Sequence, residues 1–506
     1  MLEYELDIIQ RLLDNGSTVL YFTCFANKNF CSALPNNIPN KSISSKIKCM
    51  TCKSKVSNGL NWLIYQKGDF NVRSIDEVTI TQQNTIDTLV SSLDSQISAL
   101  PELEIINQVN SILPNLHQSA LSALIDTTRN PNIKILENKV NYLANLRTCL
   151  QHHYSYLNAV SIYKPDVSYV FNGRGIYAPF VELSKKLGIF YTIYEYPVYG
   201  FSKYWLLLNT NVGDVPAISN YLYSFYLDNV KLIDNNFDLA CEFLEGRRNY
   251  NFNSCEDVVY NRAFKKLFRM SLPSSIDNSK PIIVYFSSSS SEFATFENFK
   301  NSKITTQNQI ISFISSSFPL ANIIVRAHPN SSSEDSKLLE QGLLLEASNI
   351  TYCSPSDNIS SYFLADSAAC VITYGSSMGY EAAYKGALVI TIGYSMYGAF
   401  NLDYVATSLN SLYQAVDNAI YGDQSLFPSK DDRIKNAITY ASTYISFGTE
   451  PLYLKRKSYF GGHMYRGKER KYIRPSVFFA FLDKLLGFIE RAYNKFIVFL
   501  NVLQPL

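Results

Sequence analysis

The hydrophobic and polar positions of residues 371–393 follow the pattern of a buried strand, a tight turn, a helix and a second buried strand. Val371 and Ile372 are apolar, a helical pattern begins near Met378 and ends at Gly386, and Leu388–Ile392 is apolar again. The turn between the first strand and the helix consists of small residues: Gly375, Ser376 and Ser377. This order predicts a βαβ unit with a parallel sheet.

Two further apolar runs end in polar residues that suit an anion. Ile282–Phe286 runs into the serines 287–291, which include Ser287 and Ser288. The run that begins at Ala321 ends in a polar group: Arg326, His328, Pro329 and Asn330. Ligands of open α/β sheets bind beyond the carboxyl ends of the strands, and Arg and His can donate to phosphates. We interpret the three strand ends as one nucleotide-phosphate site.

Glu381 lies one turn into the expected helix after the serine turn. The N-terminus of that helix offers unpaired N–H groups and partial positive charge to a phosphate, and Glu381 could accept hydrogen bonds from a neighbouring ribose. The alternative is an ordinary crossover in which Glu381 only favours the start of the helix, because short motifs often match by chance.

The HP dipeptide after a strand and the later TYGSSMGYEA segment resemble the donor-binding half of GT-B glycosyltransferases from bacterial surface-polysaccharide pathways. The chain is similar to capsule polysaccharide biosynthesis proteins and, in outline, to bacterial Kdo transferases and polysialyltransferases. Tyr169–Arg174, Lys186–Gly188 and Tyr194–Pro197 resemble the strand–NGR–helix–strand–glutamate order of the N-terminal half. The resemblance covers most of residues 1–400. It implies two doubly wound Rossmann-like α/β domains that face an interdomain cleft.

The same resemblance implies roles on the donor side. His328 would contact the donor phosphate, Ser376 and Ser377 would bind it in the turn, and Glu381 would face the ribose or the sugar. The implied reaction moves a sugar from a nucleotide-sugar donor onto a growing capsule or O-antigen glycan, free or lipid-linked. It needs no bound metal ion, and no DxD-type cluster follows a strand in the second half of the chain.

An inverting transferase needs a base that removes the proton of the acceptor hydroxyl. Glu195, at a strand end in the first half, is the candidate, and Asn172 and Arg174 would line the acceptor side. The alternative for Glu195 is a salt bridge to Arg174. The adjacent His152 and His153 lie in a helical context, and we expect them at the surface or between the domains rather than in catalysis.

The chain departs from the family pattern in two places. It begins with a helical pattern, Leu2–Leu13, where relatives open with a strand, and this difference bears on the floor of the acceptor side. Glu195 is followed by Tyr196 and Pro197 rather than by a glycine-containing turn.

Length and charge agree with a two-domain enzyme. A chain of 506 residues is too long to fold around one hydrophobic core. A net charge of +2 gives no indication of nucleic-acid binding. The first helix carries acidic residues where a signal peptide is positive, and no apolar run reaches the roughly 18 residues of a membrane span. We therefore expect a cytoplasmic protein.

The patterns divide the chain into four parts. Residues 1–225 form an N-terminal acceptor-side domain with a helical insertion, and residues 226–275 form a polar connector. Residues 276–450 form the nucleotide-sugar-binding domain, and residues 451–506 form a basic and amphipathic helical tail.

The tail joins basic residues to an apolar stretch, Val477–Leu503, which charges interrupt. An amphipathic helix beside basic residues suits the anionic inner face of the plasma membrane. The alternative is a helix that packs back onto the first domain, since amphipathicity alone does not distinguish the two.

Four of the nine cysteines lie near the N-terminus: Cys24, Cys31, Cys49 and Cys52. Four thiolates with this spacing can complete a structural zinc site. The alternative is that they are ordinary thiols, with Cys31 in the core.

Three other functions fit the same motifs. A sugar-nucleotide epimerase of the UDP-GlcNAc 2-epimerase type also places a serine–glycine helix terminus on the diphosphate, and it needs no acceptor. A polyol-phosphate transferase shares the fold and the strand-end histidine. A non-catalytic scaffold of a polysaccharide assembly complex would keep the fold without turnover.

Overall fold

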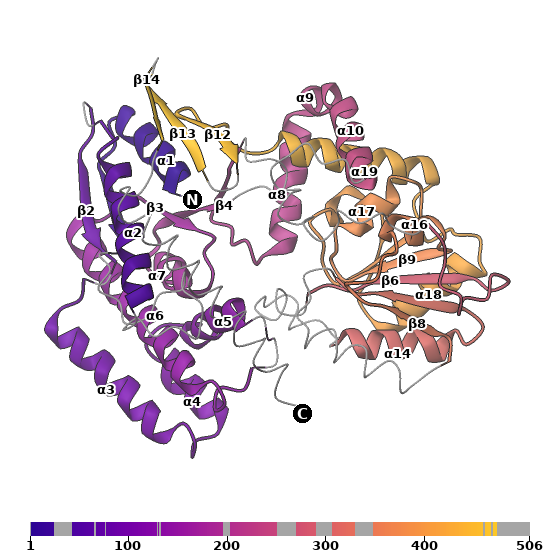
Figure 1. The fold of residues 1–506 in the computed structure, drawn as a ribbon, viewed down its shortest axis with the longest axis horizontal. Helices are drawn as coiled ribbons and strands as arrows, with labels where there is room; N and C mark the ends of the chain where they lie inside the picture. Colours follow the sequence, from indigo (N-terminus) through magenta and orange to yellow (C-terminus); the bar gives the residue numbers. More distant parts are fainter. Residues whose placement is uncertain are drawn as a thin grey trace, which may run out of the picture.

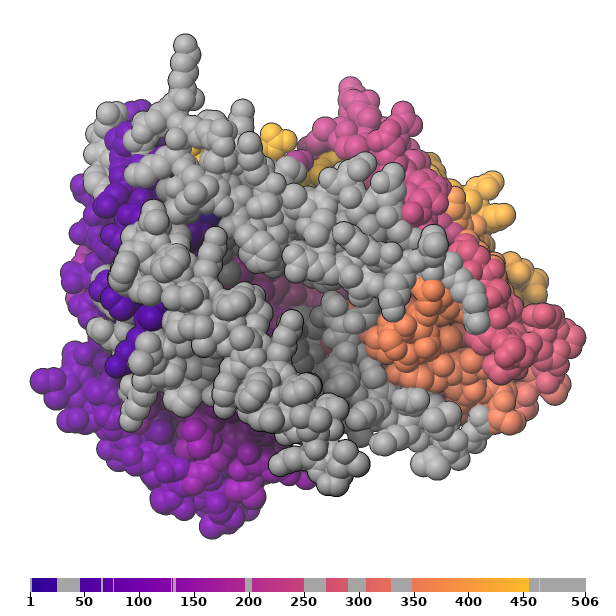
Figure 2. Space-filling view, viewed as in Figure 1, coloured from indigo at the N-terminus to yellow at the C-terminus, as the bar shows by residue number. Residues whose placement is uncertain are grey.

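The computed structural model describes residues 2–24, 43–64, 67–75, 77–128, 130, 133–195, 203–249, 270–289, 306–328, 348–458, 461–466 and 469–472. These residues form two α/β domains that lie side by side, the N-terminal one in indigo to magenta and the C-terminal one in orange (Figure 1). In the space-filling view the same colours occupy opposite sides of the molecule (Figure 2). The predicted fold class, with two Rossmann-like α/β domains, is confirmed.

The described strands of the C-terminal domain form one six-stranded parallel sheet in the order β11-β10-β9-β6-β7-β8. The strands are β6 (Ile282–Phe286), β7 (Asn322–Arg326), β8 (Ile350–Cys353), β9 (Cys370–Thr373), β10 (Val389–Ile392) and β11 (Tyr404–Ala406). The chain winds outward from β6 through β8 and then, in the opposite direction, from β9 through β11. This is the doubly wound order, and such sheets bind ligands where the winding reverses, here between β6 and β9.

Successive side chains of a strand point to opposite faces of the sheet, and in these strands both sets are apolar. Helices therefore cover both faces. Ile283 packs on the face that α14 (Gln307–Ser317) and α18 (Leu409–Ile420) cover. Val284 packs on the other face. That face is covered by α16 (Ser361–Asp366), α17 (Met378–Ala383) and α19 (Lys430–Ser446). Burial on both faces explains the unbroken apolar runs from which the strands were predicted.

Residues 226–249 of the predicted connector are mostly helical and pack on the C-terminal domain. The helices α8 (Val215–Asp228), α9 (Val230–Asn235) and α10 (Phe237–Arg248) all contact α19 (Figure 1). A short helix, η2 (Gly398–Phe400), contacts α8. These residues therefore belong spatially with the second half of the chain.

In the N-terminal domain, β3 (Val167–Phe171) and β4 (Phe190–Glu195) pair in parallel, and β5 (Trp205–Leu208) adds to β4 in antiparallel. A separate parallel pair, β1 (Val19–Thr23) and β2 (Phe70–Ser74), completes the described strands of this domain. The strand, helix and strand that the resemblance implies around residues 169–195 are present as β3, the helix at 178–187 and β4. The helices are α1 (Leu2–Asp14), α2 (Ile43–Leu60), α3 (Ile80–Gln96), α4 (Glu102–Asn110), α5 (Leu116–Thr128), α6 (Lys139–Tyr163), η1 (Gly175–Tyr177) and α7 (Ala178–Leu187).

The expectation that His152 and His153 lie at the surface or between domains is wrong. Both are buried, at 0% and 5% exposure, because α6 packs against α3, α5 and α7 and so has little free surface. The Nδ1 atom of His152 lies 2.6 Å from the carbonyl oxygen of Ile176, within hydrogen-bond distance. Burial, with the nearby Lys186 adding to it, lowers the pKa of His153 to about 4.

The first part of the tail forms strands, so the prediction of a helical tail is wrong there. The strands β12 (Leu454–Ser458), β13 (Gly461–Arg466) and β14 (Glu469–Tyr472) form an antiparallel sheet that contacts α1. Leu454 and Met464 are buried in the same apolar cluster as α1, which holds the sheet on the N-terminal domain. The amphipathic stretch 477–503 lies outside the described residues.

Among the described residues, no helix combines the length and the apolar character that crossing a membrane would require.

Candidate functional site

The carboxyl ends of β6 and β7 are joined by hydrogen bonds. The main-chain N–H of Ser287 donates to the carbonyl oxygen of Arg326 over 3.0 Å, and that of His328 donates to the hydroxyl oxygen of Ser287 over 2.9 Å. Ser287 and His328, both predicted to serve the donor, therefore lie next to each other. The end of this polar group, Pro329 and Asn330, lies outside the described residues.

Ser288 connects β6 to β9, the two strands between which the winding reverses. Its hydroxyl donates to the carbonyl oxygen of Tyr374, directly after β9, over 2.5 Å. The side chain of Gln307 accepts from the main-chain N–H of Ser288 over 2.9 Å and donates to its carbonyl oxygen over 3.0 Å. Gln307 could not be singled out from the sequence, because it is an ordinary polar residue at the start of α14.

The turn at residues 375–377 is open to a ligand. Gly375 has a φ of 68°, and the Ser376 hydroxyl oxygen accepts from the main-chain N–H of Met378 over 3.3 Å. The main-chain N–H groups of Ser376 and Ser377 donate to no acceptor among the described residues. Such N–H groups can bind an anion. The following helix α17 has only six residues and ends before the predicted Gly386, so the turn itself provides most of the donors.

Tyr397 supports this turn from inside the domain. Its hydroxyl donates to the carbonyl oxygen of Ser376 over 3.0 Å and lies 3.3 Å from the hydroxyl oxygens of Thr373 and Thr391. A Cβ at Gly379 would lie 2.0 Å from the Tyr397 hydroxyl oxygen, so only glycine fits there. Sequence reasoning missed both Tyr397 and the reason for the glycine.

Arg326 is turned into the domain rather than toward the turn. The residue is 4% exposed, and its guanidinium donates to the carbonyl oxygens of Ser354 over 2.5 Å and Asp357 over 3.3 Å. The Nε atom of Arg326 donates to the hydroxyl oxygen of Ser361 over 3.4 Å. Arg326 thus holds the loop between β8 and α16, and its contact with a donor phosphate stays a prediction.

Glu381 is also engaged inside the protein. Its residue is 1% exposed, Arg247 donates to Oε1 from Nε over 3.0 Å, and the Tyr362 hydroxyl donates to Oε2 over 2.5 Å. Burial works to lower the pKa of Arg247, but the charge of Glu381 outweighs it and raises that pKa well above its ordinary value. The carboxylate therefore links α17 to α10 and α16. Its contact with a ribose stays a prediction.

The structure thus brings some of the predicted donor residues together and not others. Ser287, Ser288, His328 and the turn 375–377 share one edge of the sheet, whereas Arg326 and Glu381 form contacts within the domain. The Arg247–Arg248 pair was visible in the sequence, but nothing in the spacing of these residues indicated a partner 134 positions away.

In the N-terminal domain, the strand ends of β3 and β4 place Asn172 against Glu195. The Asn172 side-chain amide donates to Glu195 Oε2 over 2.5 Å, and the residue adopts a left-handed conformation with a φ of 58°. Arg174 contacts Asp126 instead, with 3.4 Å between guanidinium nitrogen and carboxylate oxygen. The predicted base and one acceptor-side residue therefore lie together.

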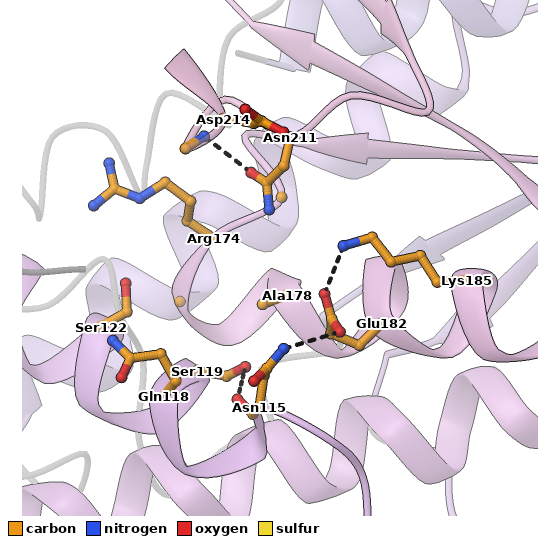
Figure 3. A pocket seen from close by; sticks show the side chains of 13 residues that line it. Asn115, Gln118, Ser119, Ser122, Arg174, Ala178, Glu182, Lys185, Asn211 and Asp214 are labelled. Atoms are coloured by element: carbon orange, nitrogen blue, oxygen red, sulfur yellow. Dashed lines mark hydrogen bonds and ion pairs between the residues drawn. The ribbon is translucent and has the colours of Figure 1, made fainter. Parts of the chain in front are cut away.

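A cavity of about 180 Å³ adjoins this loop (Figure 3). Its walls are residues 173–175, the first turns of α5, the helix α7 and the segment 211–214 before α8. Apart from Arg174, sequence reasoning named none of its lining residues, because four segments far apart in the chain build it.

The predicted cysteine cluster lies only partly within the described residues. Cys24 is exposed after β1, Cys49 and Cys52 lie on α2, and Cys31 is outside the described residues. The described ranges contain no group of three His, Cys, Asp or Glu residues that could hold a metal ion. The structural zinc site stays a prediction.

No family model matches the chain, and no curated protein matches its sequence. Among solved structures, the β-Kdo 2,7-transferase KpsC of Thermosulfurimonas dismutans is similar at 14% identity and a TM-score of 0.34, over 65% of this chain and 89% of that one. The UDP-GlcNAc 2-epimerase of Methanocaldococcus jannaschii, solved with UDP-GlcNAc and UDP, has 14% identity and a TM-score of 0.27, over 58% and 79%. MnaA of S. aureus, solved with UDP, has 11% identity and a TM-score of 0.28, over 85% and 94%.

At these identities and TM-scores, the likenesses assign no function or residue to this chain. They include Kdo transferases, which the sequence motifs resemble, and UDP-GlcNAc 2-epimerases, which are one of the three alternative functions.

Proposed function

We propose that this chain is a glycosyltransferase that moves a sugar from a nucleotide-sugar donor onto a glycan acceptor. The observation that carries the proposal is the hydrogen bond between the Ser288 hydroxyl and the carbonyl oxygen of Tyr374. It holds a serine loop beside a serine turn at the point where a doubly wound sheet binds its ligand. The motifs that resemble capsule polysaccharide proteins support a bacterial surface glycan as the acceptor.

In this proposal the C-terminal domain stabilises the leaving nucleotide. The N–H groups of Ser376 and Ser377, together with His328, receive the phosphates and offset the negative charge that develops on them. Ser287 and Ser288 position these groups. Because main-chain donors and His328 supply the positive potential, the proposed transfer needs no bound metal ion.

The N-terminal domain supplies the base. Glu195 removes the proton of the acceptor hydroxyl, and the amide of Asn172 orients the Glu195 carboxylate. The base and the donor loops thus come from different domains, and each lies at the carboxyl end of its strand.

The first test is nucleotide binding, measured by thermal unfolding of the full chain with CMP, UDP and GDP. A ligand that binds only the folded state stabilises it by about 2.7 kcal/mol at one hundred times its Kd. The nucleotide sugar that matches the best nucleotide is then supplied with and without a glycan acceptor. A transferase consumes the donor only with the acceptor, whereas an epimerase alters the donor without it.

Three variants locate the site. His328→Ala should abolish transfer, and Ser288→Ala should weaken nucleotide binding about tenfold, since one hydrogen bond contributes about 0.5–1.5 kcal/mol. Ser279→Ala, an exposed serine before the amino end of β6, is the matched control and should bind like the wild type. Absence of nucleotide stabilisation, or equal binding by the two serine variants, would refute the proposal.

A further inference from the structure

The cavity in the N-terminal domain plays no part in the proposed donor chemistry. Its volume of about 180 Å³ is below the roughly 300 Å³ at which sites for drug-sized ligands begin. It can therefore hold one small unit, but not a whole nucleotide sugar. The hydrogen-bonding side chains of its lining come from several sides (Figure 3).

The charged residues of the cavity offset one another. Lys185 donates to Glu182 over 3.0 Å, and Arg174 pairs with Asp126 at 3.4 Å. The carboxylate of Asp214 caps α8 by accepting from the helix main chain over 3.2 Å. The lining itself carries two cations, Arg174 and Lys185, and two carboxylates, Glu182 and Asp214, so it offers no net charge to a ligand.

Uncharged groups that both donate and accept make up much of the remaining wall. The Ser122 hydroxyl is buried, in a residue 5% exposed, and it has no hydrogen-bond partner in the described structure. It points toward the side of the cavity where Arg174 lies (Figure 3). A buried hydroxyl without a partner costs about 1–3 kcal/mol, and a ligand hydroxyl would remove that cost. Ser119 donates to the carbonyl oxygen of Asn115 over 2.8 Å, which leaves its oxygen able to accept.

We propose that this cavity binds one uncharged sugar unit of the acceptor glycan through its hydroxyl groups, an inference that rests on the proposed function. Sugar hydroxyls donate and accept, as the lining does, whereas a carboxylate or phosphate would bring a negative charge to a lining whose two cations, Arg174 and Lys185, already contact carboxylates. The wall residues Gly173 and Arg174 continue directly from Asn172, which holds Glu195. The wall of the cavity therefore begins one residue after the side chain that contacts the proposed base.

The test measures binding of simple glycosides to the full chain by saturation-transfer NMR and calorimetry. Methyl glucoside, galactoside and mannoside are the neutral probes, and methyl glucuronide and inorganic phosphate are the anionic ones. At least one neutral glycoside should bind. Ser122→Ala should weaken it at least fivefold, while the exposed Ser95→Ala of α3 leaves it unchanged.

Stability separates a binding role from a structural one. Because the Ser122 hydroxyl has no partner, its removal should leave the thermal midpoint at or above that of the wild type. A preference for glucuronide or phosphate, or equal glycoside binding by Ser122→Ala and the wild type, overturns the inference. Nucleotide stabilisation without glycoside binding refutes this inference alone, and glycoside binding without nucleotide stabilisation refutes the proposed function alone.

Discussion

The buried ion pair between Arg247 and Glu381 decides whether Glu381 serves the fold or the donor. Arg247 approaches Oε1 with Nε at 3.0 Å and Nη2 at 2.9 Å, and Tyr362 donates to Oε2. The Glu381 side chain is 1% exposed and that of Arg247 is 22% exposed. The informative perturbation is therefore Arg247→Met, which leaves the carboxylate buried without its cation.

The burial of Glu381 sets the size of the effect. Removal of one partner from a buried ion pair costs about 3–5 kcal/mol, because the other charge stays uncompensated. At about 2–4 °C per kcal/mol for a domain of 150–250 residues, Arg247→Met should lower the unfolding midpoint of the C-terminal domain by about 6–20 °C. Adding Glu381→Gln removes the uncompensated carboxylate charge and keeps an acceptor for the Tyr362 hydroxyl. The double variant should therefore recover most of the lost unfolding midpoint.

Calorimetric unfolding and nucleotide affinity are measured on both single variants and on the double variant. If Glu381 serves only the fold, the double variant binds the nucleotide as the wild type does. A thermally intact Glu381→Gln protein with a nucleotide affinity at least tenfold lower would refute this reasoning. It would assign Glu381 to the ribose, as the sequence motif predicts.

Two other substitutions examine the support of the turn. Gly379→Ala should displace the Tyr397 hydroxyl from Ser376, destabilise the domain by about 1–3 kcal/mol through overpacking and weaken nucleotide binding. Adding Tyr397→Phe should recover only part of the stability, because the ring carbon Cζ would still lie 2.7 Å from the new Cβ, and it should not recover binding; restored binding would contradict the role of the hydroxyl. Burial raises the pKa of Asp403 from 3.8 to about 7, and neither carboxylate oxygen has a hydrogen-bond partner in the described structure. The folded state then binds the proton more tightly, so stability should fall as pH rises from about 4 to 7. Asp403→Asn should stabilise the protein by about 4 kcal/mol at pH 8, at about 1.4 kcal/mol per pKa unit, and hardly at pH 4; equal effects in urea unfolding at both values would contradict this.

The C-terminal sheet could be predicted because its signals are local. Ile282–Phe286 is apolar at every position, and the structure buries its side chains alternately on two helix-covered faces. The serine turn after β9 could also be located, because small residues separate an apolar run from a helical pattern. The direction of individual side chains could not be predicted. The sequence suggests that Arg326 is an exposed cation at a strand end, yet its guanidinium donates to carbonyl oxygens of a later loop.

The acceptor side was harder to predict because its geometry depends on contacts between distant elements. Ser122 lies on α5 and reads as one polar position in a helix, and only the packing of the 173–175 loop beside it creates a cavity. The strands of the basic tail could not be predicted for a related reason. Leu454 and Met464, which the structure buries, are separated in the sequence by the basic residues 455–457 and by a glycine pair at 461–462, so the pattern shows no continuous apolar face.

The chain passes between the two domains at two places, and these two crossings contact each other. Tyr204 and Thr449 exchange main-chain hydrogen bonds of 3.0 and 2.8 Å, which ties the crossing before α8 to the crossing after α19. Trp205 packs edge-on against Tyr444 of α19, with ring centroids 5.5 Å apart.

From this junction α8 runs along the C-terminal domain, where Ala399 donates to the Ser219 hydroxyl over 2.9 Å. The segment 211–214 that forms one wall of the N-terminal cavity leads directly into α8. Three walls of the cavity thus belong to the N-terminal domain, and the fourth is anchored to the domain that carries the donor loops. A rotation of one domain against the other about this junction would therefore change the width of the cavity.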